Sequence, residues 1–516
     1  MTPTFYSIVA LGLTLTQALA AAYTNPQDYA QMPVPRQSPL PSESVQQGLG
    51  PLLSKNASIF GPDDSRWPEA TERYQDVAIP HVQVVVQPGV ESDIPTIVKY
   101  ANEHDINFFV VNRGHSLTVS VGKFSGIQID VRSLTDISIN KDAMTVRLQA
   151  GARNYETIDT LWKEGYVTTT GSCSCVGMVG PALGGGHGVQ QGVHGLIADN
   201  LISLNVVLAN GTSIIVSETS NPDLWWAMRG AGHNFGIVTS FEMNIYPATV
   251  LSYYYRNYVF TGKHVESLFE ELNKFHGNGS LSPTWGGAFG VYTMEPSMST
   301  TEATIFWTFI YGGSKEDAAP GLAPFDALGP VAVDEGDVPF TSISDILISG
   351  LESDLCAPSK VHITGTAGLQ VYNVTVQRQL YDLYNKKVAE EPLLAGTKLV
   401  HEGYVVEGVL RGKSEDSAFP LRDDNLLMYF DAMPPPNSGL GDFAYQWARE
   451  TEDLWNAGQA EWRKPTTYVN YAAGHESLES MYGYEPWRLE KLRALKAQYD
   501  PLNKFAYYNP IVPLES

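Results

Sequence analysis

The sequence is poor in cysteine, in basic residues and in long apolar runs, and each shortage excludes a class of protein. Three cysteines in 516 residues cannot staple a disulfide-rich scaffold, and no second cysteine pair accompanies Cys173 and Cys175 to complete a zinc site. Only 33 lysines and arginines oppose 56 acidic residues, so the net charge of -23 repels nucleic acid. No apolar run is long enough for a membrane helix. With 43% hydrophobic residues, the sequence predicts a globular protein of more than one lobe that contains no metal site.

The first twenty residues predict a secretory signal peptide. An apolar stretch over residues 8–15 leads to Ala18-Leu19-Ala20, a small-x-small cleavage pattern, and the mature chain then starts near Ala21. Four Asn-x-Ser/Thr sequons, a pattern typical of glycosylated secreted proteins, lie at Asn56, Asn210, Asn278 and Asn373. Asn210-Gly211 also separates two apolar β segments, where it suits a tight hairpin turn. We therefore expect a secreted glycoprotein.

The arrangement of apolar residues predicts an α+β fold in two lobes. Residues 21–76 are expected to form an N-terminal arm, with little core of its own up to Ser54, and the start of the first lobe. Strands and helices alternate over residues 77–249, beginning with the strand Val82–Val86 and a helix capped by Ser92-Asp93. Residues 250–461 open on Tyr-rich strands and predict a second, substrate-binding lobe. Residues 462–516 return to the first lobe through the helix Trp487–Tyr499.

Two glycine-rich segments suggest where a ligand binds. In Gly184–Gly188 the missing Cβ atoms let backbone approach a flat ligand closely, although tight turns explain the same glycines. The second cluster, Arg229–Gly236, follows an expected helix. A dinucleotide fingerprint opens a helix after a strand instead, so a nicotinamide site is not supported.

These segments together resemble the berberine bridge enzyme-like branch of the vanillyl-alcohol-oxidase-type FAD oxidoreductases, and the match covers most of the mature chain. The resembling segments include Asn112-Arg113-Gly114-His115-Ser116, Cys173-Ser174-Cys175-Val176-Gly177, Gly184–Gly188, Asn234–Thr239, Tyr468-Val469-Asn470-Tyr471 and Tyr499–Phe505. The resemblance implies a PCMH-type FAD-binding domain of two lobes, with an α/β substrate domain over the flavin. It also implies that molecular oxygen reoxidises the flavin.

The resemblance further implies that His115 is bonded to the 8-alpha methyl group of the flavin ring. It assigns FAD contacts to Val111, Asn112, Arg113, Gly114, Ser116, Leu117, Cys173, Gly177, Gly184, Gly185, Gly186, Gly188, Asn200, Gly236, Ile237, Val238 and Asn470. In some members a cysteine at the position of Cys173 forms a second bond, to carbon 6 of the ring, whereas the neighbouring Cys175 favours a different loop here. If Cys173 holds flavin, Cys175 and Cys356 can still form a disulfide; otherwise at least one thiol stays free.

The catalytic base is the main departure from the family pattern. Ala418–Arg422 resembles a family segment, and counting onward from it puts Phe430 where relatives have a Glu or Gln. Period-two alternation predicts that Asp431 faces away. Tyr468 and His187 are therefore the candidate catalytic residues: a tyrosine base requires a lowered pKa, whereas histidine titrates near neutrality. Asn470 is expected to orient the flavin or Tyr468 through its amide.

The sequence thus predicts a secreted, monomeric FAD-dependent oxidase acting on a hydrophobic secondary metabolite, with O2 as the second substrate. The apolar, Tyr-rich second lobe and the missing carboxylate favour this substrate class. An oligosaccharide or sugar oxidase is the first alternative, because aromatic side chains also stack on sugars. A redox-neutral cyclase or binding protein that keeps flavin as a scaffold is the second, and Phe430 at the base position is its motive.

Overall fold

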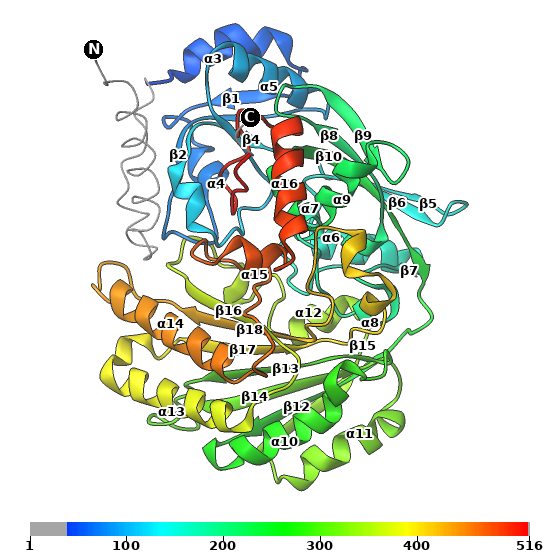
Figure 1. Ribbon diagram of the computed structural model, residues 1–516, viewed down its shortest axis with the longest axis vertical. Coiled ribbons are helices and arrows are strands. Elements are labelled where there is room, and N and C mark those ends of the chain that lie inside the picture. The colour runs from blue at the N-terminus through cyan, green and yellow to red at the C-terminus, as the bar shows by residue number, and fades with distance from the viewer. Residues whose placement is uncertain (1–38, 514–516) are drawn as a thin grey trace, which may run out of the picture.

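The computed structural model describes residues 39–513, which form two lobes packed one on the other (Figure 1). The first lobe contains two sheets and both ends of the described chain. The second lobe contains one large sheet with helices on its outer face. The predicted α+β class and two-lobed architecture are confirmed. The predicted signal peptide lies outside the described residues.

The first sheet of the first lobe has the strand order β1-β2-β4-β3. Its strands are β1 (Ser58–Phe60), β2 (His81–Gln87), β4 (Ser125–Asp130) and β3 (Phe108–Val111). Strands β2 and β3 run parallel to β4, and α5 (Asp93–Glu103) crosses between β2 and β3. Ile94, Ile97 and Val98 of α5 are fully buried in the first-lobe core, as their helical spacing predicts.

The second sheet of the first lobe is antiparallel, in the order β5-β6-β10-β8-β9. Its strands are β5 (Ile137–Asn140), β6 (Thr145–Gln149), β10 (Ile237–Asn244), β8 (Leu201–Val207) and β9 (Ser213–Ser217). The hairpin turn predicted at Asn210-Gly211 joins β8 to β9, and Gly211 has a φ of 80°. Around the two sheets lie α4 (Trp67–Thr71), α6 (Asn154–Lys163), α7 (Val179–Leu183), α8 (Gln191–His194), α9 (Pro222–Ala231) and the small pair β7 (Tyr166–Val167) and β11 (Tyr246–Pro247).

The second lobe is a seven-stranded antiparallel sheet in the order β15-β12-β14-β13-β17-β18-β16. Its strands are β15 (Ala332–Val338), β12 (Tyr253–Phe260), β14 (Thr304–Tyr311), β13 (Trp285–Thr293), β17 (Lys398–Gly403), β18 (Leu426–Ala432) and β16 (Ile363–Leu369). The helices of this lobe are α10 (Val265–His276), α11 (Lys315–Ala327), α12 (Ile343–Ile346), α13 (Val374–Glu390) and α14 (Gly441–Ala457). Helices α10, α11, α13 and α14 cover the outer face of the sheet, so its other face is directed at the first lobe (Figure 1).

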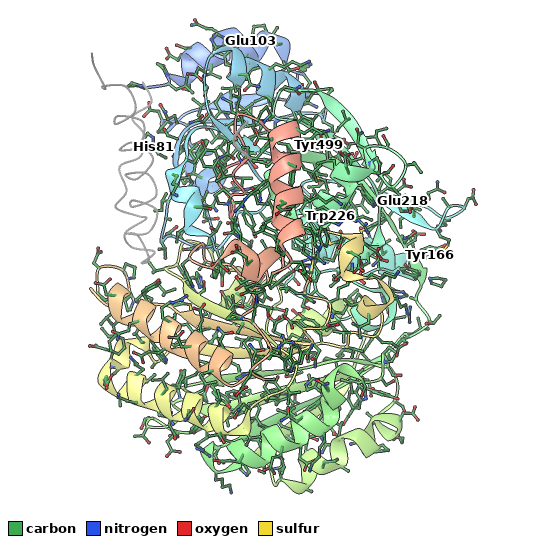
Figure 2. The ribbon with its side chains drawn as sticks, in the orientation of Figure 1. His81, Glu103, Tyr166, Glu218, Trp226 and Tyr499 are labelled. Carbon is green, nitrogen blue, oxygen red and sulfur yellow. A yellow bond between two sulfur atoms is a disulfide. The ribbon has the colours of Figure 1, made fainter. Side chains whose placement is uncertain are left out.

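The C-terminal segment returns to the first lobe through α15 (Leu478–Tyr482) and α16 (Pro486–Tyr499). Leucines on one face of α16 join the first-lobe core, as predicted. Figure 2 shows Trp226 of α9 and Tyr499 of α16 where these helices meet, and the Tyr499 hydroxyl donates to Asp223 at 3.0 Å. At the C-terminal end of α16, the fully buried Lys496 and Asp500 form an ion pair at 2.8 Å. This pair fixes the closing loop against the first lobe.

The N-terminal arm, expected to have little core of its own, docks on the first lobe through α3 (Ser42–Leu49). Val45 and Leu49 of this helix are completely buried and belong to the first-lobe core. Two apolar residues one helical turn apart are enough to dock so short a helix. Of the expected cap Ser92-Asp93, Ser92 makes no capping side-chain hydrogen bond to α5, whereas Asp93 accepts hydrogen bonds from the backbone of Gly89 and Val90. Among residues 39–513, no helix has both the length and the apolar character needed to span a bilayer.

Candidate functional site

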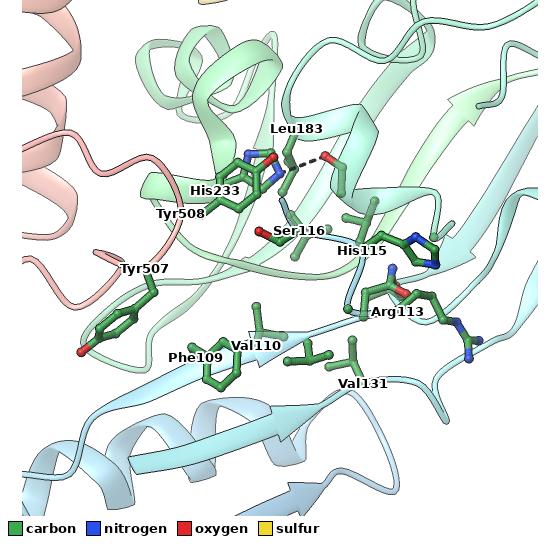
Figure 3. Close-up of a pocket in the computed structure, with 18 of the residues that line it drawn as sticks. Phe109, Val110, Arg113, His115, Ser116, Val131, Leu183, His233, Tyr507 and Tyr508 are labelled. Carbon is green, nitrogen blue, oxygen red and sulfur yellow. Dashed lines mark hydrogen bonds between the residues drawn. The ribbon is translucent and has the colours of Figure 1, made fainter. Parts of the chain in front are cut away.

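A cavity in the first lobe contains the turn that carries His115. Figure 3 shows His115 and Arg113 at one end of this cavity and Tyr507 at the other, with Phe109 and Val110 of β3 along one wall. Ten predicted FAD contacts line it: Val111, Asn112, Arg113, Gly114, His115, Ser116, Gly177, Gly236, Val238 and Asn470. These residues come from four separate parts of the sequence. The structure therefore brings together most of the site that the resemblance implied.

The backbone at Gly114 sets the position of His115. Gly114 has a φ of 73°, and a Cβ there would lie 3.2 Å from the carbonyl oxygen of Glu72. The Gly114 carbonyl accepts a hydrogen bond from the Tyr74 amide at 3.1 Å, and the Tyr74 ring stacks on the His115 ring at 5.0 Å. Burial, followed by the charge of Arg73, lowers the pKa of His115 to about 4. The imidazole is therefore neutral at physiological pH and keeps a lone pair for bond formation.

The environment of Arg73 indicates that this cavity can bind an anionic cofactor. Its side chain lines the cavity and is only 5% exposed. Its Nε has no hydrogen-bond partner, and the nearby Asp76 acts on it through its charge. Burial lowers the pKa of Arg73 to about 10, so it remains a cation. A buried guanidinium with an unsatisfied donor is costly, and the FAD diphosphate would supply an acceptor for it. The cavity therefore fits FAD.

The other predicted contacts lie away from this cavity and are held by protein groups. A Cβ on Gly184 would meet the Asn470 amide at 2.2 Å, and one on Gly188 would meet the carbonyl oxygen of Thr170 at 1.8 Å. Gly185 and Gly186 have positive φ values and lie against Phe419 and Ile197, respectively. Close packing between protein segments thus already requires these glycines.

Three more of these residues are equally enclosed. The Asn200 amide donates to the carbonyls of His194 and Leu196, and its side-chain oxygen accepts from Tyr246. Leu117 and Ile237 are buried side chains. These residues hold in place the segments that line the cavity.

The proposed catalytic pair, Tyr468 and His187, lies in an aromatic cluster between the lobes. The two rings are 4.7 Å apart, and the Asn470 amide donates to the Tyr468 hydroxyl at 2.7 Å, as expected. Burial raises the pKa of Tyr468 to about 12 and lowers that of His187 to about 4. Neither value suits a base near neutral pH, so both shifts oppose the role that the sequence suggested.

A carboxylate that the sequence analysis missed lies beside this cluster. Glu402 on β17 accepts hydrogen bonds from the Tyr471 hydroxyl, at 3.0 Å to each carboxylate oxygen. Tyr404 also donates to it. Burial raises the pKa of Glu402 to about 7, although the two phenols act in the opposite direction. A carboxyl that titrates near neutrality is well suited to general-base catalysis.

The three cysteines gather at the edge of the same site. Cys175 and Cys356 form a disulfide across 181 residues of sequence, whereas Cys173 remains a free thiol. Burial raises the pKa of Cys173, and the charge of Glu402 adds to this effect. Of the pairings left open by the sequence, the structure selects Cys175 with Cys356.

Comparison with known proteins assigns this arrangement to a family. Residues 82–217 match the FAD binding domain family, and residues 467–512 match the berberine and berberine-like family. The FAD-linked oxidoreductase anuG of Penicillium roqueforti is 52% identical to the chain, over 98% of this chain and 99% of the relative. The chain is a berberine bridge enzyme-like FAD-linked oxidoreductase.

Two solved oxidase structures share the fold at low sequence identity. The xylooligosaccharide oxidase from Myceliophthora thermophila covers 92% of this chain and all of its own, with a TM-score of 0.76 at 20% identity. The glucooligosaccharide oxidase from Acremonium strictum, described with a 6-S-cysteinyl, 8 alpha-N1-histidyl FAD, has a TM-score of 0.75 at 20% identity over the same shares of the two chains. These two likenesses establish the fold of the berberine bridge enzyme-like chain.

The sequence expectation for Phe430 of this oxidoreductase is wrong. Phe430 packs on Trp447 of α14 with its ring 5.2 Å away, in the core between the sheet and its outer helices. The alternation along β18 holds, but it places Tyr429 and Asp431, not Phe430, on the face toward the first lobe. Asp431 there accepts a hydrogen bond from His362 at 2.9 Å. Glu402 of the neighbouring strand β17 is a second carboxylate on this face of the sheet.

Proposed function

We propose that this oxidoreductase holds FAD covalently through His115 and oxidises a hydroxyl group of an apolar, aromatic small molecule, with O2 as the electron acceptor. The hydrogen-bonded pair of Glu402 and Tyr471 carries this proposal, because alcohol oxidation needs a base at the hydroxyl proton. FAD, when bound, accepts the hydride that leaves the substrate carbon.

The proton path runs through the same pair. The Tyr471 hydroxyl donates to Glu402, so Tyr471 releases its proton to the carboxylate when its oxygen receives the proton of the substrate hydroxyl. Glu402 takes this proton readily because its pKa is about 7. Tyr468, held by Asn470, and His187 form an adjacent wall that excludes water from the transfer.

The aromatic and apolar cluster beside Glu402 supports an apolar substrate. A cluster of buried apolar side chains surrounds Tyr404 and Tyr468, made up of Leu196, Val406, Val409, Phe419, Leu421 and Leu427. Such side chains favour flat, weakly polar molecules, and the phenols supply the few directional contacts. An oligosaccharide oxidase stays the alternative, because the same tyrosines offer stacking surfaces. The redox-neutral scaffold loses its motive, since Glu402 provides the carboxylate.

Secretion and glycosylation are part of the same proposal. The four sequon asparagines, Asn56, Asn210, Asn278 and Asn373, are all exposed, as glycan attachment requires. Asn373 also accepts a hydrogen bond from the Val376 amide, so its side chain caps the start of α13. A signal peptide over residues 1–20 delivers the chain to that pathway. We also propose that the protein is a monomer.

Two measurements test the proposal. Acid denaturation followed by digestion and mass analysis should place flavin on the peptide containing His115, and His115→Ala should release the flavin into the supernatant. Aerobic turnover should yield one peroxide per product with aromatic alcohols and phenolic metabolites. Peroxide from xylo- or gluco-oligosaccharides alone would establish the sugar-oxidase alternative, and flavin that no substrate panel reduces would refute the oxidase.

A further inference from the structure

The free thiol of Cys173 lies against both sulfur atoms of the disulfide. Cys173 Sγ is 3.6 Å from Cys175 Sγ and 3.9 Å from Cys356 Sγ. All three cysteines are partly exposed, so small reagents can reach them. Thiol–disulfide exchange needs a thiolate in line with the S–S bond, and Cys173 Sγ, at similar distances from both sulfurs, lies beside this bond. Rotation of the Cys173 side chain is therefore the step that brings its sulfur into line for attack.

The backbone around the sulfurs holds the reacting groups in place. Ser174 N donates to the Ser349 carbonyl at 2.9 Å, and the Ser349 hydroxyl donates to the Ser172 carbonyl at 2.9 Å. The Asn154 amide donates to the Cys173 carbonyl at 2.8 Å. The two cysteine-bearing segments are therefore tied together independently of the disulfide. A change of partner need not separate them.

Two backbone amides favour the ionised form of the Cys173 thiol, but burial disfavours it more strongly. The backbone amides of Cys175 and Val176 donate to its sulfur, which opposes the effect of burial. Burial has the larger effect and raises the pKa of Cys173 to about 11. The ionisable residues that interact with this thiol are Glu402 and Tyr74. The thiolate is thus scarce near neutral pH and becomes more abundant as pH rises.

We propose that Cys173, Cys175 and Cys356 form an internal thiol–disulfide exchange site. The Cys173 thiolate attacks Cys356 Sγ, the Cys173–Cys356 bond forms, and the Cys175–Cys356 bond breaks with Cys175 leaving as a thiolate. The proton lost by Cys173 is regained from solvent by Cys175, and no oxidant is consumed. Attack on Cys175 is unproductive, because a bridge between cysteines one residue apart is strained.

The exchange determines which thiol faces the flavin. With Cys175 and Cys356 paired, Cys173 is free to react at the cofactor; with Cys173 and Cys356 paired, that sulfur is masked. This consequence rests on the proposed FAD site, whereas the exchange itself does not. The disulfide isomer would then set whether flavin is held by His115 alone or by both residues.

A disulfide map of the wild-type holoenzyme tests the exchange. Samples are held at about pH 6 or about pH 9, quenched in acid, labelled with N-ethylmaleimide in denaturant under mildly acidic conditions, and digested with pepsin. We expect label on Cys173 alone at the lower pH, where the thiolate is too scarce to react, and a Cys173–Cys356 peptide with labelled Cys175 in part of the molecules at the higher pH. Label confined to Cys173 at both values overturns the proposal. A bond between flavin and Cys173 in every molecule also overturns the proposal, because no free Cys173 thiol is then left to exchange.

Single substitutions give a second, independent readout. In Cys175→Ser we expect Cys173 and Cys356 to pair, whereas the matched variant Cys173→Ser keeps the original disulfide. Folded Cys175→Ser with both remaining thiols labelled contradicts the exchange; if this variant does not fold, the wild-type map decides alone. Cys175→Ser should also carry flavin on His115 and none on Cys173. Absence of flavin from His115 in every protein would instead count against the proposed function.

Discussion

Replacing Glu402 with glutamine should abolish turnover while leaving the fold intact. Glutamine keeps the size of the side chain and can still bond to Tyr471, but it cannot accept a proton. Loss of a positioned general base costs about 100- to 10,000-fold in rate. We therefore expect kcat of Glu402→Gln to fall by about 1,000-fold, which corresponds to about 4 kcal/mol of transition-state stabilisation.

The same substitution should stabilise the protein at high pH. The pKa of Glu402 is raised in the folded state from 4.5 to about 7, so ionisation above this range disfavours the fold. The penalty is absent below the unfolded value, grows as pH rises from 4.5 to about 7, and reaches about 3 kcal/mol above it. Because glutamine does not ionise, the Tm of Glu402→Gln should exceed that of the wild type at about pH 8 and equal it at about pH 4.

Stopped-flow reduction of the flavin across pH, paired with thermal unfolding, measures both effects. Wild-type reduction should rise with pH through about 7 as Glu402 loses its proton, and the variant should lack this step. Glu407→Gln is the matched control, since Glu407 is exposed and forms a surface pair with Arg411. A variant that keeps a tenth of the wild-type rate with an unchanged pH profile refutes Glu402 as the base.

Three further substitutions test other parts of the structure. Arg73→Gln should lower the FAD-to-protein ratio of the purified enzyme and weaken FAD binding at least about tenfold, because the cofactor loses a charged hydrogen-bond donor; an unchanged ratio contradicts the assigned anion contact. Asp500→Asn should cost about 3–5 kcal/mol in urea unfolding by leaving Lys496 buried and unpaired, and a loss near zero would mean that the pair is not formed. Phe430→Leu should cost about 1 kcal/mol and leave kcat unchanged, as expected for a core residue; a large drop in kcat would place Phe430 in the site.

Local patterns in the sequence predicted the elements of the fold well. The helix expected over Trp487–Tyr499 is α16, which begins one residue earlier and ends at Tyr499. The hairpin turn at Asn210-Gly211 and the alternation of strand and helix in the first lobe are also present. These features depend on residues close in sequence, where apolar spacing and turn chemistry suffice. The turn at His115 was found because glycine and histidine stand in a recognisable segment.

The pair of Glu402 and Tyr471 was beyond sequence reasoning. The two residues are 69 positions apart and meet because β17 lies in the middle of the second sheet while the C-terminal segment crosses between the lobes. No motif surrounds Glu402. The only signal was an acid in the short strand Lys398–Gly403, next to the apolar residues Leu399 and Val400, and an acid in an interior strand is unusual unless it is paired or functional. Arg73 could not be found from the sequence either, because its burial depends on the fold around the cavity.

The error at Phe430 shows why a base cannot be located by counting along one strand. Successive side chains of a strand point to opposite faces of the sheet. An error of one residue therefore moves a side chain from the face toward the site to the face covered by helices. In β18 that offset separates Phe430, packed on Trp447, from Asp431, which is bonded to His362. Register across strands is more informative: Glu402 of β17 pairs with Leu427 of β18, and both belong to the face that meets the first lobe. A carboxylate can therefore come from the adjacent strand without changing the place where it acts, and the missing acid at one sequence position is no argument against catalysis.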